Sequence, residues 1–138
     1  MKRQVILTRD DPPAAWFLAD EAAFRRCVGS PEVMAGQMAH LAAVARLPKI
    51  TIQVVPAIAH AGLLGGFSLT ESAAYVETAV AGQVFENAEI TSSLLTRFDT
   101  LRNEALRASE SQALIERMGE EWKATGARAA TQPTTEPA

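Results

Sequence analysis

Residues 50–55 constrain the fold of this chain more than any other stretch, because they predict a strand that has to find partners. Apolar residues alternate along the sequence ITIQVV, and Thr51 and Gln53 fill the positions between them. Alternation with a period of two is typical of a strand that buries one face. Pro56 follows and ends the strand, since proline cannot donate to a sheet ladder. The chain therefore needs a sheet, and this strand is expected to be half-buried, with Thr51 and Gln53 on its wet face.

Strand and helix signals precede this segment. Residues 4–8 and 16–18 are expected to form short strands. Asp20 stands where an N-cap residue is preferred, ahead of a short helix. Ser30 stands in the same position before a longer helix that starts at Pro31, a residue suited to the first helical position. The first part of the chain thus combines short strands with two helices.

After the strand, the hydrophobic period changes from that of strands to that of helices. Three further short strands are expected over residues 67–71, 73–78 and 83–86. Asn87 is a suitable N-cap for a long amphipathic helix. Ser109, followed three positions later by Gln112, matches a capping box that would open a last helix.

Together these elements predict the α+β class, with a small, mainly antiparallel sheet covered by helices and two helices at the C-terminal end. Residues 1–124 are expected to form one domain. Residues 125–138 are mostly small and polar and include two prolines. Such a segment cannot bury enough apolar surface to order itself, so it is expected to be a disordered tail.

The composition excludes several classes of protein. The net charge of −3 and the lack of a basic block argue against nucleic-acid binding by this chain alone, because such affinity comes from neutralising phosphates. Cys27 is the one cysteine, which excludes an intramolecular disulfide and fits a reducing cytoplasm. No apolar run is long enough for a signal peptide or a membrane span. The expected location is the cytoplasm, away from the membrane.

Six sequence blocks, in order, carry a resemblance to a known family. They are E-x-A-x-x-R-x-x-G at 21–29, P-E-V-M-x-x-Q-M-x-H-L at 31–41, I-T-I-Q-V-V-P at 50–56, H-A-G-x-x-G-G-F-S-L at 60–69, Y-V-E-T at 75–78 and R-F-D-x-L-R-x-x-A-L at 97–106. The chain resembles the C-terminal domain, of unknown function, of actinobacterial XRE-type helix-turn-helix regulators of the antitoxin-like, WhiJ-related group. The resemblance spans roughly residues 3 to 122.

In those regulators a helix-turn-helix precedes this domain and binds DNA, whereas here Met1 stands directly before the first expected strand. The helix-turn-helix is therefore expected to be absent from this chain. The resemblance implies a sensing and dimerising role in transcription regulation, with a homodimer and a small acidic partner protein as partners. A stand-alone copy of the domain could also have been recruited for catalysis in secondary metabolism.

The glycine-rich stretch at 60–69 is the first candidate site. A phosphate loop is disfavoured, because no Lys-Ser/Thr pair follows the glycines and the next element is a strand instead of a helix N-terminus. Gly65 and Gly66 are instead expected to supply the positive φ of a bend that leads into a strand. A glycine bend beside a sheet can also admit a ligand close to the backbone.

A nucleophile–base pair and a metal site are weaker candidates. Cys27 with His40 or His60 would form such a pair only if the fold brought them together. Two histidines with no cysteine partner match no zinc spacing. The carboxylates of the strand region are expected on the solvated face, namely Glu71, Glu77 and Glu86. No metal and no cofactor is expected.

An apolar pocket beside the sheet is the most informative candidate. The residues expected to bind a small-molecule ligand there are Trp16, Phe17, His60, Gly65, Gly66, Phe67, Tyr75 and Phe85. If the chain is an enzyme, His60, Tyr75 and Glu77 are the expected acid–base residues of a cyclase or isomerase, which needs a shaped cavity and a few placed donors. Two functions stay open: an effector- or partner-binding regulatory domain that does not bind DNA by itself, and a stand-alone enzyme for cyclisation or isomerisation of a secondary metabolite.

Overall fold

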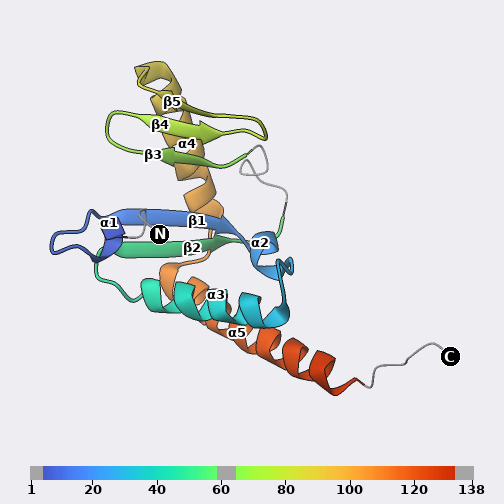
Figure 1. The fold of residues 1–138 in the computed structure, drawn as a ribbon. Helices are drawn as coiled ribbons and strands as arrows, with labels where there is room; N and C mark the ends of the chain where they lie inside the picture. Colours follow the sequence, from blue (N-terminus) through green and yellow to red (C-terminus); the bar gives the residue numbers. More distant parts are fainter. Residues whose placement is uncertain (1–4, 59–64, 133–138) are drawn as a thin grey trace.

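A computed structural model describes residues 5–58 and 65–132 of the chain. Figure 1 shows an α+β arrangement, as predicted, with a parallel strand pair, an antiparallel sheet and two long C-terminal helices. In chain order the elements are α1 (Val5–Thr8), β1 (Ala15–Asp20), α2 (Glu21–Arg25), α3 (Pro31–Val44), β2 (Ile50–Val55), β3 (Phe67–Leu69), β4 (Ala74–Glu77), β5 (Gly82–Phe85), α4 (Ala88–Glu104) and α5 (Ala108–Thr131).

The core lies where the β1–β2 pair meets the helices α3 and α5 (Figure 1). The two strands are parallel, with Phe17 opposite Ile52 and Ala19 opposite Val54. This pairing departs from the antiparallel geometry expected for most of the sheet, because the two strands are joined by a crossover that contains α3. Met38 of α3 and Ile115 of α5 are almost completely buried beneath the pair.

β2 is buried on both faces, which corrects the half-buried strand expected from its alternation. Gln53 is only 8% exposed. Its amide nitrogen donates to the carbonyl oxygen of Leu106 at 2.8 Å, in the connection between α4 and α5. The same connection covers the strand edge opposite β1, where the Leu106 N–H donates to the Val54 carbonyl at 2.9 Å. A polar residue thus becomes buried because distant backbone satisfies its amide.

Three of the predicted helix caps are confirmed, and one is wrong. The side chains of Asp20, Ser30 and Asn87 each accept a backbone hydrogen bond at the start of α2, α3 and α4, respectively. Ser109 does not cap the last helix, because α5 already begins at Ala108. Glu110 accepts the hydrogen bond from the Arg107 N–H at 3.0 Å and closes that terminus instead.

Two segments differ from the sequence expectation. The expected strand at 4–8 is helical over Val5–Thr8. A short apolar run fits either state, and Leu7 packs against the core in the helical one. At the other end, α5 continues to Thr131, so the tail expected from residue 125 does not begin there. The helix stays packed on α3 at this point, since Gly126 lies 3.5 Å from Pro31, measured from the place of its missing Cβ to the Pro31 Cβ.

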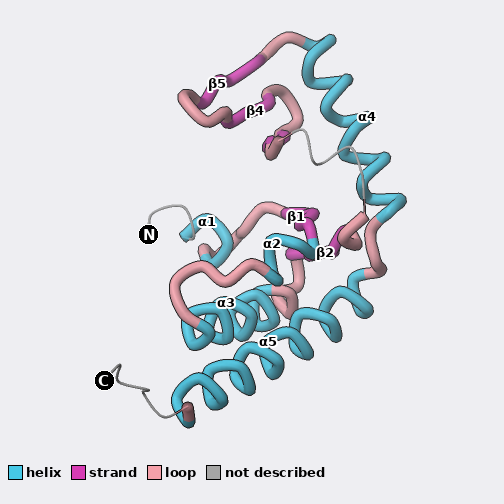
Figure 2. The backbone as a smooth tube through the Cα atoms, turned by 90° about the vertical axis from the view of Figure 1, so that its right-hand side faces the viewer, coloured by secondary structure: helices cyan, strands magenta, loops and turns pink. Residues whose placement is uncertain are grey.

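The strands β3, β4 and β5 form a separate antiparallel sheet, here called the meander (residues 67–85). Figures 1 and 2 show it apart from the β1–β2 pair, with α4 running past both. α4 contacts β3 and β4 of the meander and β2 of the parallel pair. This helix is therefore the element that joins the meander to the core. Among the described helices, none combines the length and the apolar content that a membrane crossing requires.

Candidate functional site

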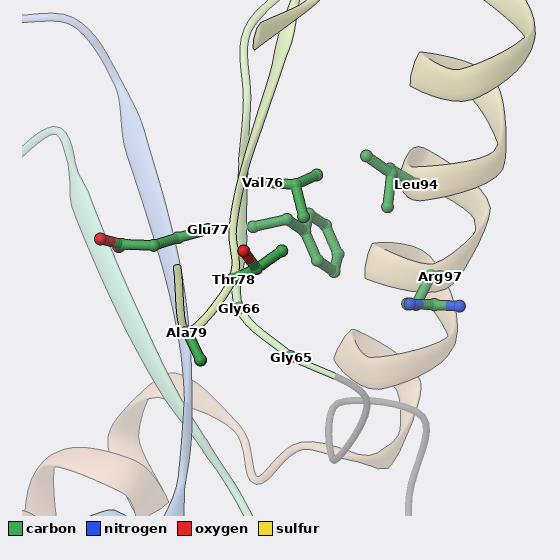
Figure 3. Close-up of a pocket in the computed structure, with 9 residues that line it drawn as sticks. Gly65, Gly66, Val76, Glu77, Thr78, Ala79, Leu94 and Arg97 are labelled. Carbon is green, nitrogen blue, oxygen red and sulfur yellow. The ribbon is translucent and has the colours of Figure 1, made fainter. Parts of the chain in front are cut away.

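A cavity of about 310 Å³ lies between the meander and α4. Figure 3 shows it, with the strand segment on one side and α4 on the other. The lining residues are Gly65, Gly66, Phe67, Val76, Glu77, Thr78, Ala79, Leu94 and Arg97.

The glycines and a turn shape the rim of this cavity. Gly65 has a φ of +126°, a conformation that side chains rarely tolerate, and Gly66 follows it directly into β3. On the other side of the sheet, Thr78 closes the β4–β5 turn, because its N–H donates to the Ala81 carbonyl at 2.8 Å and its hydroxyl donates to the same oxygen at 2.9 Å. The bend predicted at Gly65 is thus confirmed, with positive φ at Gly65 alone of the pair.

Strand alternation decides which meander side chains reach the cavity. Phe67 pairs with Val76, so both side chains lie on the face that α4 covers. In Figure 3 the Val76 side chain points toward Leu94 of α4. Tyr75, one position earlier, belongs to the opposite face, where its ring lies over Gly82, with Cζ 2.6 Å from the place of a Gly82 Cβ.

The cavity lining contains two charged residues, Arg97 and Glu77, and they are oriented differently. Arg97 is partly buried, and no hydrogen bond or ion pair joins it to another residue in the described ranges. Glu77 contributes to the wall, but in Figure 3 its carboxylate points away from α4 and from the cavity. Among the described residues, the cavity therefore presents one positive charge, that of Arg97, while the Glu77 carboxylate is turned away from it.

The structure brings together some of the ligand-binding residues expected from the sequence and separates the others. Gly65, Gly66 and Phe67 line the cavity. Phe85 pairs with Ala74 on the α4 side of β5 without lining it. His60 lies outside the described residues. Tyr75 and Glu77 are directed to the other face of the sheet, so the structure does not assemble them as an acid–base pair in this cavity.

Trp16 and Phe17 lie on β1, away from the cavity lining. The indole N–H of Trp16 donates to the Gln53 side-chain oxygen at 2.6 Å. The guanidinium of Arg102 stands 5.0 Å from the centroid of the Trp16 ring, an arrangement that permits a cation–π interaction. Trp16 thus ties β1 to β2 and α4, while Phe17 remains 43% exposed.

The other candidates for chemistry do not converge. Cys27 and His40 are both exposed, and the Cys27 thiol lies 4.0 Å from its neighbour, the Gly29 carbonyl oxygen. The three strand-region carboxylates are solvent-exposed, as predicted: Glu71, Glu77 and Glu86. Over the described ranges, no three or more His, Cys, Asp or Glu side chains gather closely enough to hold a metal ion.

A second hollow of about 190 Å³ lies near the C-terminal half of α5, against Phe24 and Trp122. Its charges already compensate each other, since Arg25 and Glu121 approach to 3.9 Å. The Trp122 indole N–H donates to the Phe24 carbonyl oxygen at 3.0 Å. This hollow is smaller and balanced, which makes the cavity beside α4 the better candidate site.

Five cavity residues were not expected from the sequence, namely Val76, Thr78, Ala79, Leu94 and Arg97. A signal existed for two of them. Leu94 and Arg97 are three positions apart, so they share one face of a helix. Which face of α4 would meet the glycine bend depends on tertiary packing, and the sequence alone does not specify it.

These features define an α+β domain in which a cavity lies between a meander and a long helix, with one arginine among its described lining residues. The family model for a domain of unknown function, DUF5753, matches residues 1–117, and the chain belongs to this family. No curated protein and no solved structure showed significant similarity to the chain.

Proposed function

We propose that this chain is an effector-binding regulatory domain and that the cavity between the meander and α4 is its effector site. The observation that carries this proposal is the cavity itself, whose volume of about 310 Å³ falls at the lower end of the range of small-molecule sites. Most of its described lining residues are glycine or apolar, and Arg97 is the one cation among them; small-molecule sites usually combine apolar walls with a few polar groups that fix orientation.

The resemblance to antitoxin-like helix-turn-helix regulators supports a role in transcription regulation. In such a regulator this domain would sense an effector, and a separate helix-turn-helix would bind DNA. The net charge of −3 is consistent with this division, because an acidic domain does not attract phosphates. Actinobacterial and cytoplasmic context, and a small acidic partner protein, belong to the same proposal.

The position of α4 offers a route from the cavity to the rest of the domain. Leu94 and Arg97 line the cavity, and Arg102, further along the same helix, stands over the ring of Trp16 on β1. A ligand that prefers one position of α4 relative to the meander would shift the population toward that position. Binding would then change the surface around β1.

That surface is where we propose self-association. Among the described strands β1 pairs only with β2, so its outer edge has no strand partner there, and such an edge is a template for pairing with another chain. Phe17 on this strand is 43% exposed. Pairing of two β1 edges about a two-fold axis would give the isologous dimer that is common among soluble proteins.

The enzymatic alternative rests on His60, Tyr75 and Glu77. Tyr75 lies on the sheet face opposite the cavity, and Glu77, although part of the wall, points its carboxylate away from it, so no observation favours cyclisation or isomerisation over effector binding.

Filling the cavity tests the proposed function. Leu94→Trp places a large side chain in the cavity from α4, whereas Leu95→Trp, on the adjacent position, changes a residue that is 53% exposed. In a thermal-shift screen of small apolar acids and neutral aromatics, a hit raises the Tm of the wild type and of Leu95→Trp, but not of Leu94→Trp. A ligand at about 100 times its Kd stabilises the folded state by about 2.7 kcal/mol. Equal responses of the two variants would place the hit elsewhere and contradict the proposal.

A further inference from the structure

Arg97 is the one cation of the described cavity lining, and the other charged lining residue, Glu77, directs its carboxylate away from the cavity (Figure 3). The other arginine of α4 with a defined role, Arg102, already pairs with Asp99 at 3.2 Å and stands over the Trp16 ring. Arg97 has no such partner among the described residues. A partly buried guanidinium attracts an anion more strongly than a fully exposed one, because water screens its charge less.

The remaining lining residues indicate the size and polarity of the rest of the ligand. Phe67, Val76 and Leu94 are apolar; Phe67 pairs with Val76 on the meander, and Val76 faces Leu94 of α4 across the cavity (Figure 3). Gly66 leaves open space where a Cβ would stand, with no atom within 4 Å of that position. The volume of about 310 Å³ is about twice the roughly 150 Å³ that holds one benzene ring in an engineered protein cavity. Two fused rings, or an aliphatic body of similar size, would fit.

Resting on the proposed function, we infer that the cavity takes a small organic acid with one carboxylate and an apolar body. The carboxylate meets the Arg97 guanidinium, whose planar fork donates two parallel hydrogen bonds to a carboxylate. The apolar body lies between Phe67 and Val76 on the meander and Leu94 on α4.

A single carboxylate matches this site better than a phosphate does. A phosphate monoester carries a charge of roughly −1.5 to −2 at neutral pH, and the described lining holds only one cation, Arg97. The described part of the cavity wall consists of strand and turn residues and the flank of α4, and it includes no helix N-terminus that would add N–H groups. A doubly charged group would therefore be only partly compensated here.

The test compares 1-naphthoate with its uncharged amide, 1-naphthamide, by isothermal titration calorimetry. The wild type is expected to bind naphthoate about tenfold more tightly or better, since a charge-assisted hydrogen bond is worth that much. Arg97→Gln removes the preference and leaves the Kd of naphthamide unchanged. Arg128→Gln, an exposed position on α5, is the matched control and behaves as the wild type. Circular dichroism checks that Arg97→Gln is folded.

Different failures point to different causes. If naphthamide binds as tightly as naphthoate, and Leu94→Trp abolishes both, the effector cavity stands and the acid specificity is wrong. If inorganic phosphate displaces naphthoate at similar concentration, the site is a general oxyanion site and the carboxylate assignment is overturned. If neither naphthalene compound binds the wild type, both the inference and the proposed function fall.

Discussion

Ser111 gives the sharpest test of how the structure is held together. The residue is fully buried, and its hydroxyl oxygen accepts the hydrogen bond of the Val54 N–H at 2.9 Å. Val54 is itself fully buried, in the centre of the core. Ser111→Ala therefore removes the acceptor of the buried Val54 N–H, and because the site is buried, water does not replace that acceptor.

The expected cost follows from what is left without a partner. A buried N–H that loses its acceptor costs about 1–3 kcal/mol. The Leu106 carbonyl, which also receives the Ser111 hydroxyl at 3.3 Å, keeps its bond from the Gln53 amide at 2.8 Å and adds little. The sum is about 2 kcal/mol, which lowers the Tm of a domain of this size by about 6 °C.

Urea denaturation followed by circular dichroism measures this cost, with Ser109→Ala as the matched control. Ser109 lies two positions away, exposed, in the first turn of the same helix. Its replacement should change the free energy of unfolding by less than about 0.5 kcal/mol. The reasoning is refuted if Ser111→Ala is as stable as the wild type, or if Ser109→Ala loses as much, as the capping box expected from the sequence would require.

Three further predictions concern the bend, the strand edge and a helix cap. Gly65→Ala should lower the free energy of unfolding by about 1 kcal/mol or more in urea denaturation, because a φ of +126° is strained for a residue with a side chain. Gly66→Ala should be nearly neutral. Equal losses in the two variants would contradict the positive φ assigned to Gly65. Phe17→Lys should convert a dimer to a monomer in light scattering without changing the circular dichroism, since a charge on an edge strand opposes pairing; a monomeric wild type would exclude the β1 dimer. The hydrogen bond from Ser30 lowers the pKa of Glu32 from its usual 4.5, so Ser30→Ala should raise that pKa in an NMR titration. Because the pKa of Glu32 is lower in the folded state than in the unfolded state, its ionised carboxylate stabilises the fold above the usual pKa, and this stabilisation is lost as pH falls through the folded-state pKa. An unchanged pKa in Ser30→Ala would contradict the hydrogen bond from Ser30 as the cause of the shift.

Local chemistry predicted the elements of the fold well. The side chains of Asp20, Ser30 and Asn87 cap helices because the required backbone donors are only two or three positions away. The β2 alternation likewise predicted a strand at the correct position. Ser109 does not cap the last helix, because α5 begins one position earlier, at Ala108, and Glu110 accepts the Arg107 N–H at that terminus.

Pairing and burial were harder to predict, because they depend on residues far apart in sequence. The alternation predicts that Gln53 faces solvent. Its side-chain amide instead forms hydrogen bonds with Trp16 and Leu106, which are 37 and 53 positions away in the sequence. The parallel pairing of β1 with β2 also depends on the crossover through α3. The hydrophobic periodicity of the sequence does not indicate which strands pair or in which direction.

The candidate site was half predictable. Gly65, Gly66 and Phe67 were expected, because glycines mark a close approach of backbone. Tyr75 and Glu77 were expected beside them, but alternation puts both on the face opposite Val76. Choosing between these faces requires knowing that α4 covers one of them.

Ligand-to-protein nuclear Overhauser effects in the wild-type protein saturated with 1-naphthoate test the central claim most directly. The methyl groups of Val76 and Leu94 stand on opposing walls of the cavity. A bound naphthalene ring should show contacts to both residues in the same complex, and the contacts should be absent in Leu94→Trp. A saturated complex whose ring contacts neither methyl group would contradict the assignment of this cavity as the effector site.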